Sequence, residues 1–263
     1  MGCCHRVGRV SDPLVVVAGL PGVPEAVSEA REAVDVLYRH RILRRRQPEV
    51  SAESALRGAR ASAELEGVDV PLGTLRAGEA DDPVAQGALR VSAELGRLGP
   101  LWRSAPPQVL ARLHTLAAAG LLADPGRPRT GPTVADPLGI GPAPADVSAR
   151  MAALAGLTST KAPALVLGAI VHAEIVALRP FGVADGLVAR AAERLSLVEH
   201  GLDPKSLVAV EVGHRESMGA YTQALKAYLT GTPEGVAAWV VHCARAVVLG
   251  VRETTAICEA LSR

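Results

Sequence analysis

Aromatic side chains are scarce in this chain, and that scarcity limits the folds it can adopt. One Phe, two Trp and three Tyr occur among 263 residues, although hydrophobic residues make up 49% of the sequence. Strands favour aromatic and β-branched residues, whereas a core built from Ala, Leu and Val suits closely packed helices. The composition therefore predicts an all-α protein and excludes most all-β folds.

The charge and the cysteine content limit the classes of partner that such a helical protein can bind. Lys and Arg number 28 against 27 Asp and Glu, so no global field attracts nucleic acid or anionic lipid. The best apolar run, over 162–171, is too short to span a bilayer. Four cysteines without a CxxC pair, and without histidines grouped for zinc, indicate a reduced protein. We expect a cytoplasmic protein with no nucleic-acid partner, no membrane partner and no metal ligands.

The period of apolar residues divides the chain into three parts. Residues 1–24 show no clear period and are expected to form an irregular N-terminal arm. Residues 25–82 are expected to hold the N-terminal helices. Residues 83–263 are expected to form the core, interrupted by a Gly/Pro-rich, flap-like segment over 123–143. With no internal repeat and no strong boundary, the chain is predicted to form a single domain.

Helix boundaries follow from the same period and from capping residues. Proline, glycine and the run of arginines at 44–46 mark the expected ends. Helices are expected over 25–46, 52–66, 83–98, 106–122, 144–156, 161–178, 185–200, 211–229 and 233–261, with a loop over 68–82.

The stretch over 178–190 carries the most information about function. Pro180 cannot continue the preceding helix, and Gly182 and Gly186 permit unusual backbone angles. The chain then enters a helix whose first N–H groups can cradle an anion. A helix, a Gly-rich loop and a second helix also fit an ordinary tight connection, so this pattern alone is a weak signal.

The loop resembles that of the Fic (Fido) family, whose pattern is H-P-F-x-[D/E]-G-N-G-R-x-x-R. Pro180, Phe181, Gly186 and Arg190 match it. The family's inhibitory-helix pattern, [S/T]-x-x-x-E-[G/N], is matched by residues 62–67, at Ser62, Glu66 and Gly67. Further likenesses lie around His114, Pro125 to Arg129, and 231–239, so the resemblance covers about residues 25–261.

The resemblance implies a helical fold and an activity. Fic proteins transfer AMP from ATP, with Mg²⁺, to a hydroxyl group of a target protein, and some members move other phosphate-containing groups or reverse the reaction. ATP with Mg²⁺ is thus the implied cofactor and a protein the implied partner. Gly186 and Arg190 are the implied phosphate-binding positions, and the resemblance leaves open whether the chain forms a homo-oligomer.

Several positions depart from the family pattern. The family's general base, a histidine, falls on Arg179, and arginine stays protonated in proteins. The metal-binding acid falls on Val183, the asparagine on Asp185, and the first phosphate-binding arginine on Leu187. General base catalysis alone is worth roughly 10²–10⁴-fold. We therefore expect a pseudoenzyme of the protein adenylyltransferase type that acts as a nucleotide-sensing or protein-binding module.

An active alternative remains. The chain could be a nucleotidyl or phosphate-group transferase, or a hydrolase, that acts on a protein through altered chemistry, with Asp185 as the base. Two ion pairs are also predicted. Glu66 and Arg190 are expected to pair and close the nucleotide pocket, and Arg179 and Asp185 are expected to neutralise each other.

The remaining histidines have simpler interpretations. His172 lies on an apolar helix and is expected to be a hydrogen-bonded core residue rather than a catalytic one. His114 and His242 are expected to pack on their own helices.

Overall fold

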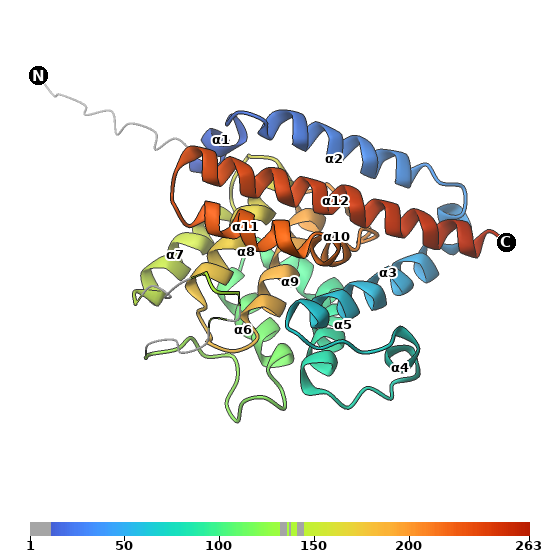
Figure 1. The fold of residues 1–263 in the computed structure, drawn as a ribbon, viewed down its shortest axis with the longest axis horizontal. Helices are drawn as coiled ribbons and strands as arrows, with labels where there is room; N and C mark the ends of the chain where they lie inside the picture. The colour runs from blue at the N-terminus through green and yellow to red at the C-terminus, as the bar shows by residue number, and fades with distance from the viewer. Residues whose placement is uncertain (1–11, 132–135, 137, 141–144) are drawn as a thin grey trace, which may run out of the picture.

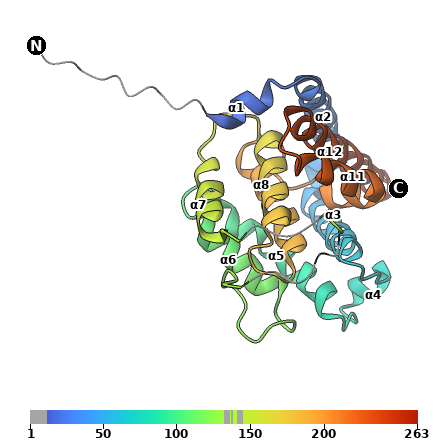
Figure 2. The ribbon, with the colours of Figure 1, turned by 60° about the vertical axis from the view of Figure 1, so that its left-hand side comes forward.

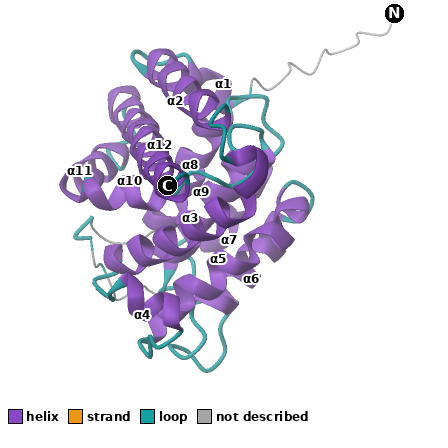
Figure 3. Cartoon of the chain, turned by 90° about the vertical axis from the view of Figure 1, so that its right-hand side faces the viewer, coloured by secondary structure: helices purple, strands orange, loops and turns teal. Residues whose placement is uncertain are grey.

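Helices account for all the regular structure that the described part of the chain contains (Figure 3). The computed structural model describes residues 12–131, 136, 138–140 and 145–263. Twelve helices and no strand occur among these residues, and the prediction of an all-α fold is confirmed.

The helices follow one another with short connections, apart from the long segment between α6 and α7. In chain order they are α1 (Pro13–Ala18), α2 (Val23–Tyr38), α3 (Leu43–Leu65), α4 (Leu72–Ala77), α5 (Pro83–Trp102), α6 (Pro106–Ala117), α7 (Val147–Leu157), α8 (Ala164–Leu178), α9 (Asp185–Glu199), α10 (Val210–Glu216), α11 (Met218–Tyr228) and α12 (Pro233–Leu261).

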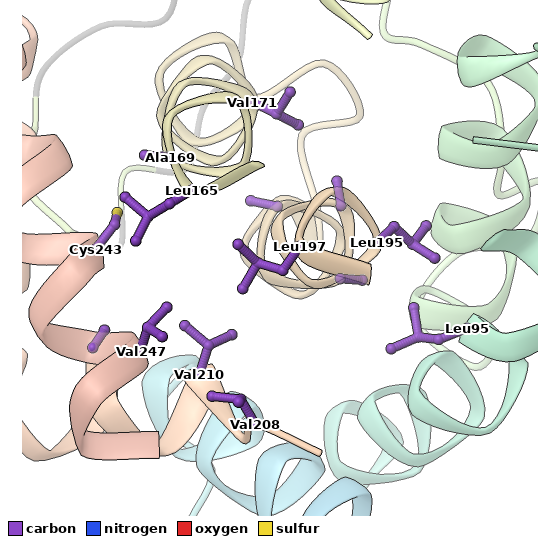
Figure 4. Close-up of a cluster of buried hydrophobic side chains, with 14 of the residues drawn as sticks. Leu95, Leu165, Ala169, Val171, Leu195, Leu197, Val208, Val210, Cys243 and Val247 are labelled. Atoms are coloured by element: carbon purple, nitrogen blue, oxygen red, sulfur yellow. The ribbon is translucent and has the colours of Figure 1, made fainter. Parts of the chain in front are cut away.

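The pair α8 and α9 lies at the centre of the molecule. Glu174 is the one residue of α8 that is not buried, as expected for a helix that is apolar on all sides. Helices α5, α6 and α10 pack against α9, while α7 and α12 pack against α8. Figure 2 shows α7 and α12 on opposite sides of α8. The core between them is filled by aliphatic side chains such as Leu165, Leu195, Val210 and Val247 (Figure 4).

The longest helix, α12, combines length with an apolar composition. By those two criteria alone it could cross a membrane, but 61% of its most apolar window is buried inside the fold. It packs against α2, α10 and α11, and α2 runs along its outer side (Figure 1). Its apolar character is therefore used in the core of the helical bundle.

The N-terminal part differs from expectation. Of the predicted irregular arm, residues 1–11 lie outside the described part, and helix α1 with the start of α2 occupies eight of the other 13 residues. The Asp12 side chain accepts a hydrogen bond from the Leu14 N–H and another from the Thr160 hydroxyl. An N-cap Asp followed by Pro13 is a recognised helix start, so the sequence did contain the signal.

Three boundaries were also misplaced. The break between the first long helices falls before Leu43, so that Pro48 lies inside α3, where it was expected to end a helix. Arg46, with φ −126°, interrupts the helical backbone there because a proline ring clashes with the preceding turn. The predicted loop over 68–82 contains α4, and the predicted helix over 211–229 is divided at Ser217.

Candidate functional site

The connection between α8 and α9 forms the floor of the candidate site. Three of its residues have a left-handed backbone: Arg179 (φ 45°), Gly182 (φ 81°) and Ala184 (φ 57°). These conformations turn the chain within six residues and deliver Asp185 to the first turn of α9. Ala184 stands where the family pattern has glycine, and a left-handed non-glycine residue costs about 1–2 kcal/mol.

Arg129, from the flap-like segment, fastens this loop through its backbone carbonyls. Its Nε donates to the Arg179 carbonyl at 2.9 Å and its Nη2 to the Leu178 carbonyl at 3.1 Å. Its backbone N–H donates to the Pro180 carbonyl at 2.7 Å. A single arginine thus satisfies carbonyl groups left open at the end of α8.

His114, on α6, supports the loop from below. Its Nδ1 accepts the Gly126 N–H at 2.8 Å, so Nε2 carries the proton and donates to the Val183 carbonyl at 3.2 Å. The ring also stacks on Phe181, with 4.1 Å between the ring centres. Burial lowers the pKa of His114 to about 4, which keeps the ring neutral, as both hydrogen bonds require. The expected packing role is correct, and the two hydrogen bonds go beyond it.

The predicted pairing of Glu66 with Arg190 is confirmed. Glu66 Oε1 lies 2.7 Å from Arg190 Nη2, and the Arg190 side chain is 2% exposed. Arg190 also donates from Nε to the Ser62 hydroxyl at 2.8 Å and from Nη2 to the Ser62 carbonyl at 3.0 Å. Gly67 ends this segment of α3 with φ 88°. The resemblance to the family thus predicted a contact between two residues that are far apart in the sequence.

Gly186 lets the Glu66 carboxylate come this close. A Cβ atom at position 186 would collide with Glu66 Oε1 and crowd Arg190 Nη1. The glycine is therefore required by the close approach of α3 to α9.

The predicted pairing of Arg179 with Asp185 is wrong. Arg179 Nη1 instead lies 3.2 Å from Oδ1 of Asp136, in the flap-like segment. Asp185 Oδ1 accepts the Phe181 N–H at 2.9 Å. Because the left-handed Arg179 ends α8, its side chain leaves the helix towards the flap.

Asp185 has an unusual proton affinity. Burial is the main cause that raises its pKa, to about 7, and the charge of Glu66 adds to the rise. Hydrogen bonds from the Phe181 and Gly182 N–H groups oppose it. Near neutral pH this carboxyl group is therefore a mixture of protonated and ionised forms.

A cavity of about 260 Å³ lies over the loop. Its charged lining consists of Glu66, Asp136, Arg179 and Asp185. The apolar walls are formed by Leu65, Val84, Leu121, Leu138, Ile140, Val176, Val183 and Leu187. The cavity is thus mainly apolar, and three of its four charged residues are acidic.

The residues present do not fit ATP with Mg²⁺. Val183 offers no side-chain oxygen to a metal ion, and its carbonyl is bonded to His114. Leu187 lines the cavity where the family pattern has a phosphate-binding arginine. Phosphate groups in this cavity would also face the carboxylates of Glu66 and Asp136, which repel them.

The sequence and the structure were compared with those of known proteins. No protein-family model matches the sequence, and no curated protein matches it either. Among solved structures, a Fic family protein from Desulfovibrio desulfuricans is similar, with a TM-score of 0.73 and 21% identity over 88% of this chain and 74% of that one.

Two further structures agree. Fic-1 from C. elegans has a TM-score of 0.68 and 16% identity, over 94% of this chain and 75% of that one. A Fic domain containing signaling protein from Bacteroides thetaiotaomicron has a TM-score of 0.67 and 14% identity, over 89% of this chain and 98% of that one. The chain therefore has the fold of Fic proteins.

Proposed function

We propose that this protein is a Fic-fold binding module that does not carry out ordinary AMP transfer. The observation that carries the proposal is the position and engagement of Arg179. A guanidinium group stays protonated and cannot accept the proton of a target hydroxyl. The side chain is 8% exposed and is held by Asp136 at 3.2 Å, so it also fills space next to the loop.

The lining of the cavity supports a protein partner over a nucleotide. Its walls are largely aliphatic, and an apolar side chain of a partner gains about 25 cal/mol for each Å² of apolar surface that it buries. We propose that a partner protein inserts such a side chain here, with the Glu66–Arg190 pair closing the inner end. A cytoplasmic location is part of the proposal, since the buried Cys243 and Cys258 are free thiols.

An assay of label transfer tests the loss of activity. ATP labelled at the α-phosphate is incubated with cell extract and either the wild-type protein or the Glu66→Gly variant, in which the ion pair is absent. We expect neither to label itself or any other protein. Label on a protein with either of them, above a heat-inactivated control, would contradict the proposal.

A restored loop provides the matched positive control. Arg179→His, Val183→Asp, Asp185→Asn and Leu187→Arg together recreate the polar groups of the family pattern in the Glu66→Gly background. Label transfer by this variant alone would assign the loss of activity to the loop. Silence of the restored variant beside active Glu66→Gly protein would reject that assignment.

One observation favours a second candidate function. Asp185 lines the cavity, and its pKa is raised to about 7, which is the range in which a general base works best. In this candidate, Asp185 takes the proton of a hydroxyl group or water molecule in a transfer or hydrolysis reaction. Activity of Glu66→Gly that disappears in the double variant with Asp185→Asn would establish it.

A further inference from the structure

A second cluster of titratable residues lies in the core, away from the cavity. Glu193 Oε2, on α9, lies 2.6 Å from Nδ1 of His172, on α8, and 2.9 Å from Nε2 of His214, on α10. The side chains of both histidines are 0% exposed and that of Glu193 is 1% exposed. Three helices therefore direct one donor group each to the same buried point.

The outward nitrogen atoms of the two imidazoles are also held. His172 Nε2 lies 2.8 Å from the Tyr221 hydroxyl, and His214 Nδ1 lies 3.1 Å from Nε2 of His242. Both partners can accept or donate, so either ring tautomer is accommodated. Histidines that bind metal ions in proteins almost always have their second nitrogen fixed in this manner.

The cluster is short of positive charge. Among the described residues, the ion pairs of Glu193 are with these two histidines and with no Lys or Arg.

A buried carboxylate without a cation is costly. The nearby Arg190 does not remove the deficit, because its guanidinium group is paired with Glu66. The missing charge has to come from a retained proton or from a metal ion.

We propose that His172, Glu193 and His214 bind a divalent transition-metal ion, and that the ion is zinc. Two imidazole nitrogens and a carboxylate oxygen are ordinary zinc ligands, and the three donor atoms lie within 4.8 Å of one another. Donor atoms around a tetrahedral zinc ion are about 3.3 Å apart. Small side-chain rotations that lengthen the two N–O distances by roughly 0.5 Å would make room for the ion.

Proton positions are consistent with this assignment. Zinc binds the unprotonated nitrogen, so His172 would carry its proton on Nε2 and His214 on Nδ1. Those protons point to the Tyr221 oxygen and to His242 Nε2, which are within hydrogen-bonding distance. The Cys243 thiol is hydrogen-bonded to Glu193.

Such an ion would be structural. The rings of His172 and His214 pack against Trp239, with ring centres 5.2 and 6.2 Å apart, and the side chains of all three proposed ligands are buried. No local sequence pattern indicates this cluster, because its successive members are 21 residues apart and lie on different helices. This proposal departs from the expectation that the chain has no metal ligands.

Metal analysis of the intact protein tests the proposal. Protein purified without an affinity tag from zinc-supplemented medium is expected to hold about one zinc per chain, retained in EDTA while folded and released by EDTA in guanidinium. Refolding with Co²⁺ is expected to give the visible absorption of tetrahedral cobalt. Purified protein without bound metal, which also takes up neither zinc nor cobalt on refolding, would overturn the proposal and leave a retained proton as the source of charge.

Two matched variants locate the ion. Glu193→Gln keeps the shape but removes the anionic ligand, and is expected to lose the metal. Glu211→Gln removes another buried carboxylate, which pairs with Arg194 at 3.3 Å, and is expected to keep it. Metal retained by folded Glu193→Gln, or lost equally from both variants, would overturn the assignment. If Glu193→Gln does not fold, the cobalt spectrum of the wild-type protein decides.

Discussion

Glu66 and Arg190 lie 124 residues apart in the sequence, yet their charged groups are 2.7 Å apart. Arg190 is almost fully buried, while the Glu66 side chain is 18% exposed. The Ser62 hydroxyl and carbonyl hold the same guanidinium group. The last turns of α3 are therefore attached to α9 through one arginine, and Glu66 also lines the cavity.

Removing this ion pair should lower stability measurably. Glu66→Gln is expected to reduce the free energy of unfolding by about 2 kcal/mol, because a buried arginine loses its counter-charge. Ser62→Ala is expected to cost about 1 kcal/mol through one lost hydrogen bond. Chemical denaturation measures both. Glu49→Gln is the control, since its pair with Arg46 is exposed and should contribute less than about 0.5 kcal/mol; equal losses for Glu66→Gln and Glu49→Gln would refute the prediction.

Replacing Ala184, whose backbone is strained, should raise stability rather than lower it. Its φ of 57° suits glycine, so Ala184→Gly should relieve about 1–2 kcal/mol of strain against a loss of about 0.4–1 kcal/mol from a more flexible unfolded chain. A net stabilisation of about 0.5–1 kcal/mol is expected from these two terms. Ala152→Gly, at an exposed position of α7, should instead destabilise by about 1 kcal/mol. Thermal unfolding of both variants should shift in opposite directions, and a parallel shift would count against strain at Ala184.

The lowered pKa of His114 should make the free energy of unfolding depend on pH in acid. Its folded pKa of about 4 lies below the ordinary 6.5, so between these pH values the unfolded chain binds more protons than the folded one. The contribution of His114 is therefore complete above about pH 6.5 and is lost as the pH falls towards 4. We expect about 2 kcal/mol of pH-dependent stability from this residue, seen as a flatter acid limb for His114→Asn in unfolding curves. An unchanged acid limb would show that His114 is protonated in the folded protein.

The raised pKa of Asp185 should change the free energy of unfolding with pH in the opposite direction. Its folded pKa of about 7 lies above the ordinary 3.8, so the folded protein binds the extra proton and stability is lost as the pH rises from about 4 to 7. Asp185→Asn should stabilise the protein by up to about 4 kcal/mol at about pH 8 and have little effect at about pH 4. The asparagine oxygen can still accept the Phe181 N–H. Asp146→Asn, at the N-cap of α7, is the control and should show no such difference between the two pH values.

The sequence predicted the helical class and the Glu66–Arg190 pair for different reasons. The class follows from composition and from the apolar period, which are properties of single segments. The pair came from two short patterns on separate helices, linked only by their resemblance to a family. Residues 12–18 show no clear apolar period, although Asp12 and Pro13 mark a helix start. Pro48 predicts the end of a helix, but it lies inside the kinked helix α3.

The remaining parts of the site depend on contacts that no local pattern encodes. Arg179 reaches Asp136 because a left-handed residue ends α8 and directs the side chain to the flap-like segment, which has no apolar period. His114 meets Phe181 only once α6 lies under the loop. His172, Glu193 and His214 converge because three helices cross at one place in the core.

Calorimetric titration with ATP and Mg²⁺ tests most directly whether the cavity still serves a nucleotide. The wild-type protein and Glu66→Gly, with the inner end of the cavity opened, would be titrated side by side. No heat of binding is expected for either protein up to about millimolar ATP, a limit that corresponds to roughly −4 kcal/mol. Micromolar affinity in either titration would contradict the account, because it would show that Arg179, Val183 and Leu187 have not closed the site to nucleotides.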